Sequence, residues 1–156
     1  MKTRNPFAKA AFTAAIIVFL SAASPQAALA DHSWRTLVGS WLVDLGPDPA
    51  GVPIQDLATL NWPGTIITSS PTFGAGHGAW KRIGRRDFEL KFLTLIPADN
   101  PLGFPPNSTL TVTAFLTVGD SGDEASGTNT GVFADSAGDV LFEVSGPVTF
   151  TRINVD

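Results

Sequence analysis

Apolar and polar residues alternate with a period of two along most of this chain, and no long segment shows the 3.6-residue period of an amphipathic helix. The alternation is clearest in residues 109–118, where every even position is aliphatic and four of the five odd positions are threonine. Successive side chains of a β-strand point to opposite faces of its sheet, so this pattern predicts strands with one buried face. We therefore expect an all-β protein.

Eight segments carry the pattern, and turns rich in glycine, proline and aspartate separate them. Short connections favour antiparallel pairing of neighbouring strands. Eight one-sided strands either expose two long edges or close on themselves, so we expect an eight-stranded antiparallel up-and-down β-barrel, with a two-sheet sandwich as the alternative. The expected strands cover residues 37–45, 55–61, 65–69, 79–83, 87–96, 109–118, 126–134 and 140–155, the last with an irregularity at Gly146-Pro147.

The first thirty residues have the composition of a secretory signal rather than of a strand. They begin with basic residues, continue with an apolar run of about fourteen residues, and end in the small-residue sequence Ala28-Leu29-Ala30. The run is shorter than the roughly twenty residues that span a bilayer as a helix. We expect a signal peptide at residues 1–30, a single domain at residues 31–156, and a secreted or periplasmic protein with no membrane span after cleavage.

Charge and composition exclude several kinds of site. The chain has no cysteine, so it can form no disulfide, zinc–thiolate site or iron–sulfur cluster. Removal of residues 1–30 leaves seven basic side chains against fourteen acidic ones, so nucleic acid is not an expected partner. No phosphate-binding loop, dinucleotide fingerprint, nucleophile elbow or His-Glu-x-x-His motif is present, and we expect no cofactor and no metal. The oligomeric state is left open.

Two short motifs lie on the first and the last of the expected strands. The first strand contains Gly39-Ser40-Trp41, and the last strand carries Arg152 within the sequence Thr-Phe-Thr-Arg-Ile. A Gly-x-Trp motif on the opening strand, with an arginine near the end of the closing strand, resembles the lipocalin and calycin superfamily. The resemblance implies that Trp41 plugs one end of the barrel and that Arg152 packs over it. The paired cysteines common in that family are absent here.

The aromatic side chains point to an apolar interior. The sequence has four tryptophans and eleven phenylalanines but no tyrosine, and many of them fall on the inward positions of the expected strands. Because no catalytic motif is present, the leading interpretation is a barrel protein that binds a small hydrophobic or amphipathic molecule. The residues expected to line its binding site are Trp80, Phe88, Leu90, Phe92, Leu110, Val112, Phe142 and Phe150.

A second hypothesis is a cofactor-free isomerase, cyclase or hydratase that acts on a hydrophobic substrate in the same pocket. His77 lies in a glycine-rich segment expected to be a loop, and it would transfer protons near neutral pH. Arg82 would stabilise developing negative charge. The competing interpretation makes both residues solvated surface groups. A third hypothesis is a surface or assembly module with a packed interior and no ligand.

Overall fold

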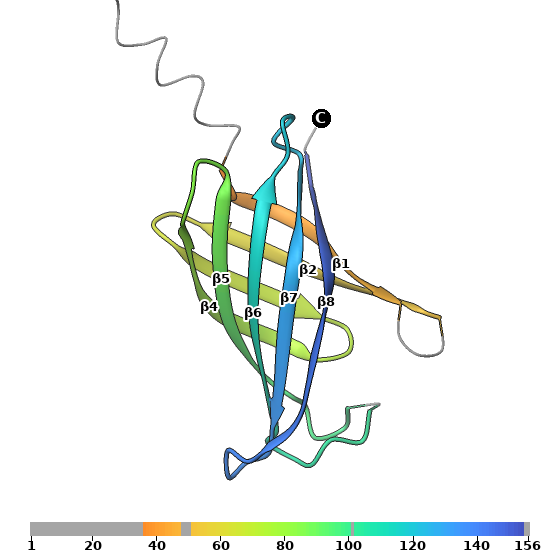
Figure 1. Ribbon diagram of the computed structural model, residues 1–156. Coiled ribbons are helices and arrows are strands. Elements are labelled where there is room, and N and C mark those ends of the chain that lie inside the picture. Colours follow the sequence, from red (N-terminus) through yellow and green to blue (C-terminus); the bar gives the residue numbers. More distant parts are fainter. Residues whose placement is uncertain (1–35, 48–50, 101, 155–156) are drawn as a thin grey trace, which may run out of the picture.

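Eight strands form one closed antiparallel barrel in which each strand pairs with its neighbours in the chain and β8 returns to β1 (Figure 1). The computed structural model describes residues 36–47, 51–100 and 102–154, and the expected signal peptide lies outside these ranges. The up-and-down barrel is confirmed, and the sandwich is not formed. The strands are β1 (Gly39–Pro47), β2 (Pro53–Asn61), β3 (Thr65–Ser70), β4 (Gly74–Arg82), β5 (Asp87–Leu95), β6 (Thr109–Val118), β7 (Glu124–Ala134) and β8 (Val140–Arg152).

Strand β4 begins five residues earlier than the sequence predicts, and the expectation of a glycine-rich loop before residue 79 is wrong. Gly76 and Gly78 lie inside the strand and pair with Thr94 and Phe92 of β5. A Cβ atom at Gly78 would collide with the backbone of Lys91 and Phe92. These glycines therefore allow β4 and β5 to approach closely. From the sequence alone, the same glycines suggest a flexible loop.

The irregularity expected at Gly146-Pro147 is also absent. Both residues continue the regular register of β8 with β7, where Pro147 pairs with Thr128. The register shifts instead between Phe133 and Ala134 of β7. The turn-forming pair therefore does not interrupt the strand. Proline is tolerated here because β8 lies beside β1 over only part of its length, as described below.

The barrel interior contains two hydrophobic clusters. One surrounds Trp41 and includes Phe88 and Leu116, all of which are buried. The other lies toward the opposite end of the barrel and includes Phe73 and Phe133. The two clusters leave a middle section of the barrel that neither fills completely.

The loop between β5 and β6 covers the end of the barrel that lies farthest from Trp41. Phe104 of this loop stacks on Phe133, with ring centroids 4.8 Å apart and an interplanar angle of 7°. Phe142 of β8 stacks on the same ring at 4.3 Å. Stacked rings from a loop and two strands hold this end together although the loop has no strand of its own.

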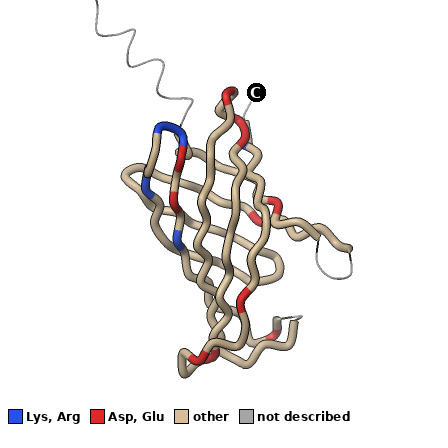
Figure 2. Tube along the Cα trace, in the orientation of Figure 1, with Lys and Arg blue, Asp and Glu red and all other residues tan. Residues whose placement is uncertain are grey.

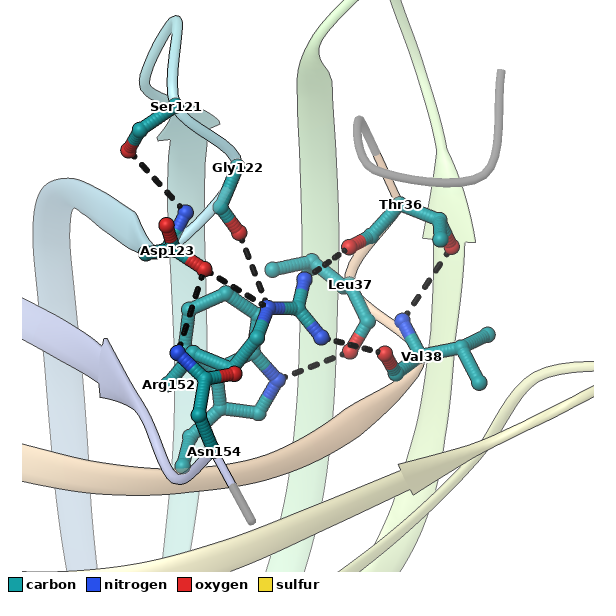
Figure 3. Close-up of polar contacts among 9 residues, drawn as sticks. Thr36, Leu37, Val38, Ser121, Gly122, Asp123, Arg152 and Asn154 are labelled. Atoms are coloured by element: carbon teal, nitrogen blue, oxygen red, sulfur yellow. Dashed lines mark hydrogen bonds and ion pairs between the residues drawn. The ribbon is translucent and has the colours of Figure 1, made fainter. Parts of the chain in front are cut away.

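At the end of the barrel that contains Trp41, Arg152 connects the last strand of the sheet to the first (Figure 3). Its guanidinium lies over the ring of Trp41, with Cζ 4.2 Å from the centroid. It also donates hydrogen bonds to the carbonyl oxygens of Val38 at 2.7 Å, Thr36 at 2.8 Å and Gly122 at 2.9 Å. Charge-assisted bonds and a cation–π contact thus connect Arg152 of β8 to the segment that leads into β1 and to the turn between β6 and β7.

Trp41 is the second residue of this joint, by which we mean the contacts that connect β1 to β8 around Arg152. The residue is fully buried, and its indole nitrogen donates a hydrogen bond of 2.8 Å to the carbonyl oxygen of Leu37. Its ring packs edge-on against Phe150 of β8. The indole therefore fills the end of the barrel while its polar atom is satisfied.

Gly39 explains the first position of the Gly-x-Trp motif. Its φ angle is +138°, a conformation that side chains rarely adopt. A Cβ atom at this position would lie 2.5 Å from Nη1 of Arg152. Glycine is therefore required both by the backbone and by the guanidinium that occupies the space beside it.

Replacing Arg152 tests how much the joint stabilises the fold. Arg152→Ala removes the cation–π contact and the three carbonyl bonds, and we expect it to lower the free energy of unfolding by about 3 kcal/mol. Arg85→Ala is the matched control, because Arg85 is exposed, and its cost is expected to stay within about 0.5 kcal/mol. Urea denaturation followed by tryptophan fluorescence measures both. Equal stability of the two variants would contradict the assignment.

Gly39→Ala tests the space beside the guanidinium separately. We expect a loss of about 2 kcal/mol from backbone strain and the contact with Arg152. Gly46→Ala serves as control, because Gly46 also has positive φ but has no atom within 4 Å of a built Cβ. In an Arg152→Ala background the difference in cost between the two alanine variants should become smaller, because only the backbone strain remains at Gly39. If Gly39→Ala is no worse than Gly46→Ala in the native background, the steric explanation fails.

Candidate functional site: a cavity inside the barrel

A cavity of about 280 Å³ occupies the middle of the barrel, between the two hydrophobic clusters. Strands β1 to β3 and β5 to β8 contribute to its wall, together with Phe73 of the turn before β4. Large side chains fill the barrel around Trp41, whereas the cavity wall includes small residues such as Ala58, Ala114 and Gly131. The change from large to small inward side chains leaves the space unfilled.

The cavity reaches the side of the barrel where β1 and β8 separate. These strands pair only from Trp41 with Arg152 to Asp44 with Thr149, whereas β8 pairs with β7 along nearly its whole length. Beyond that point the β1–β2 hairpin and the β7–β8 hairpin leave the barrel in different directions (Figure 1). Both sides of this divergence contribute to the cavity wall, with Leu45 and Pro47 on β1 and residues 144–146 on β8.

Asp56 of β2 places a carboxyl group in this mostly apolar wall. It shares the inward side of its strand with Ala58 and Leu60, both of which are buried. Its Oδ1 atom is buried and has no hydrogen-bond partner. Burial raises the pKa of Asp56 above its ordinary value, because removal from water disfavours the charged form. Hydrogen bonding to Ser70 acts in the opposite direction.

Ser70 is held where it can face Asp56. The two residues continue the register that pairs Leu57 with Ser69, so they lie opposite each other on β2 and β3. The Ser70 hydroxyl accepts hydrogen bonds from the backbone nitrogens of Thr72 at 3.2 Å and Phe73 at 3.1 Å. Its own proton is therefore free to be donated toward the carboxyl group.

Further polar atoms lie deeper in the wall. Thr68 of β3 and Thr94 of β5 flank Gly76, and a Cβ atom at Gly76 would collide with both hydroxyl groups. Asn129 contributes to the wall from β7. The cavity thus combines an apolar surface with a few polar groups, which is the usual composition of a small-molecule site.

Half of the expected ligand-binding residues line the cavity. Phe92, Leu110, Val112 and Phe150 belong to its wall. The structure places Trp80, Phe88 and Leu90 in the packed cluster around Trp41. Phe142 stacks on Phe133 at the far end and is 41% exposed.

The two residues considered for catalysis do not meet in the cavity. His77 is exposed on the outer side of β4, where it pairs with Ile67 and Leu93, which are also exposed. Arg82 is exposed at the end of the same strand, and its guanidinium lies 5.1 Å from the ring of Phe88. Neither residue belongs to the described cavity wall.

The basic residues of β4 and β5 gather on this hairpin together with acidic ones (Figure 2). Lys81 pairs with Glu89 at 2.7 Å, and Arg86 pairs with Asp120 of the turn between β6 and β7. These exposed ion pairs link neighbouring strands and turns, and each contributes little to stability.

The sequence interpretation missed Asp56, although a signal for it exists. Two and four residues after Asp56 lie Ala58 and Leu60, so the alternation itself places the aspartate on the inward side. An acidic residue at an inward strand position is unusual, because an unpaired charge is costly to bury. The cavity that it faces required the structure.

Comparison with known proteins does not assign the barrel to a family: no family model matches the chain, and no curated protein matches it. Across residues 36–47, 51–100 and 102–154, no three histidine or acidic side chains are grouped closely enough to hold a metal ion. In the same part of the chain no helix has the length and apolar character needed to cross a membrane.

The raised pKa of Asp56 predicts a pH dependence of stability. The folded protein holds the Asp56 proton more tightly than the unfolded chain does, so this group lowers the free energy of unfolding as pH rises from about 3.8 through the raised pKa. Asp56→Asn removes this contribution. The free energy of unfolding of Asp56→Asn, relative to that of the native protein, should therefore increase as pH rises from 3.5 to 7.

Denaturation by urea at both pH values measures the effect. Asp44→Asn is the control, because Asp44 is exposed on the neighbouring strand and carries the same charge. A stability difference between native protein and Asp56→Asn that does not change with pH would show that the carboxyl group titrates normally.

Proposed function

We propose that this protein binds a small hydrophobic or amphipathic molecule inside its barrel and carries out no covalent chemistry on it. The observation that supports this most directly is the unfilled cavity of about 280 Å³ with its largely apolar wall. A barrel of eight strands can be filled by its own side chains or can hold one small ligand. Apolar cavities bind apolar molecules because the ligand loses unfavourable contact with water and gains contact with the wall.

The dimensions of the site favour a compact ligand. Pockets for small molecules typically measure roughly 300–1,000 Å³, so this cavity of about 280 Å³ lies just below that range. Phe73, Phe92, Phe133 and Phe150 supply aromatic faces from different parts of the wall. A flat aromatic or cyclic molecule would contact such a wall better than a long flexible chain.

We propose that the barrel is of the lipocalin and calycin type and that the protein is secreted or periplasmic. The eight-stranded barrel and the contact between Trp41 and Arg152 support the first statement. The basic, apolar and small-residue regions of the first thirty residues support the second. A binding protein of this kind needs no cofactor and no partner other than its ligand.

Binding of N-phenyl-1-naphthylamine, whose fluorescence rises in apolar surroundings, tests the cavity. Val112→Phe adds a ring on the cavity side of β6 and should weaken binding by at least tenfold. Thr113→Phe adds the same ring on the opposite side of the strand and should change affinity less than threefold.

A native protein that gives no fluorescence increase, or a Val112→Phe variant that binds as the native protein does, would count against the proposal. Native mass spectrometry of protein purified from its own host would in addition reveal the mass of a bound molecule.

A further inference from the structure

We propose that the cavity selects small apolar molecules that carry an ammonium group, and that the carboxylate of Asp56 pairs with this cation. The inference rests on the proposed function and adds the chemical class of the ligand. It follows from one unpartnered oxygen atom, from the lack of other ionisable side chains in the described cavity wall, and from the position of Asp56 along its strand.

The first step is that Asp56 has no positive partner among the described residues of the cavity wall. It is the only ionisable side chain among the described residues of the cavity wall. Lys81 and Lys91, on the strands across the barrel, are exposed on the outer surface. Arg152 packs over Trp41 and donates hydrogen bonds to three backbone carbonyl groups. The charge on Asp56 is therefore not neutralised by any described residue of the wall.

The second step is that the carboxyl group keeps one oxygen available. Oδ1 is buried without a hydrogen-bond partner, and Ser70 is positioned to donate toward the group. A hydroxyl that donates to a carboxylate favours its charged form. A buried unpartnered acceptor is costly, and a ligand that supplies a positive donor removes that cost on binding.

The third step is the position of Asp56 along the strand. It pairs with Val43, and Val43 also pairs with Phe150, one step before the pairing of β1 with β8 ends at Asp44. The carboxyl group thus lies at the level where the two strands begin to separate. A ligand could place its charged group at this opening, where the group retains some water, and its apolar part between the phenylalanines of the wall.

A neutral ligand would need a different arrangement. A hydroxyl or carbonyl group could bond to a protonated Asp56, but that arrangement makes no use of the negative charge. An ammonium group offers three donors, which suits a wall that contains the Asp56 carboxylate oxygen and the hydroxyl group of Thr68. An anionic ligand would be repelled.

Three naphthalene compounds of similar size separate these cases by isothermal titration calorimetry at pH 7: 1-naphthylmethylamine, 1-naphthylmethanol and 1-naphthoate. The native protein should bind the amine at least tenfold more tightly than the alcohol, and the anion least tightly. Asp56→Asn should bind the amine no better than the alcohol. Asp44→Asn, which removes the same charge from the outer surface, should change the amine affinity less than twofold.

The outcomes distinguish the two proposals. If the native protein binds all three compounds equally, or the alcohol most tightly, the ammonium preference is wrong while the binding function stands. If it binds none of them and no N-phenyl-1-naphthylamine, the proposed function fails first. Circular dichroism checks that Asp56→Asn is folded, and Asp56→Glu, which keeps the charge, should retain a preference for the amine. A Glu variant without that preference, when folded, would also overturn the inference.

Discussion

The pairing of β1 with β8 closes this barrel, and the guanidinium of Arg152 reinforces that junction. Strands β1 and β8 share only a short register, from Trp41 with Arg152 to Asp44 with Thr149. So few backbone pairs are a weak connection between the first and last strands of a sheet. Arg152 strengthens it through Trp41 and through the carbonyl groups of Val38 and Thr36. The absence of a side chain at Gly39 leaves the space that the guanidinium occupies.

The same short register explains why the interior is hollow. Because the joint holds only one end of the β1–β8 contact, the strands separate beyond it, and residues on both sides of the separation line the cavity. Small residues such as Ala114 and Gly131 also line the cavity, and the phenylalanines of the loop and of β7 close the far end. The barrel is thus divided along its axis into a solid core around Trp41 and a cavity beside Asp56.

Much of this fold can be predicted from the alternation of residues, because a period of two identifies a strand and also its inward side. The bounds of β6 (Thr109–Val118) follow from the sequence without error. Gly76 and Gly78 could not be interpreted in this way, because what requires them is the backbone of β5, which is distant in sequence. The inward position of Asp56 was available from the pattern. The cavity was not, since it depends on where β1 and β8 separate.

The joint also has a consequence for how the chain reaches its final shape. Arg152 contacts carbonyl groups that lie 114 and 116 residues earlier in the sequence. Without the pairing of β8 to β1, the sheet would have two open edges. Contacts between such distant segments form slowly, because the chain must first give up the entropy of the large loop between them. Closing the barrel through Arg152 therefore carries the entropy cost of ordering nearly the whole described part of the chain.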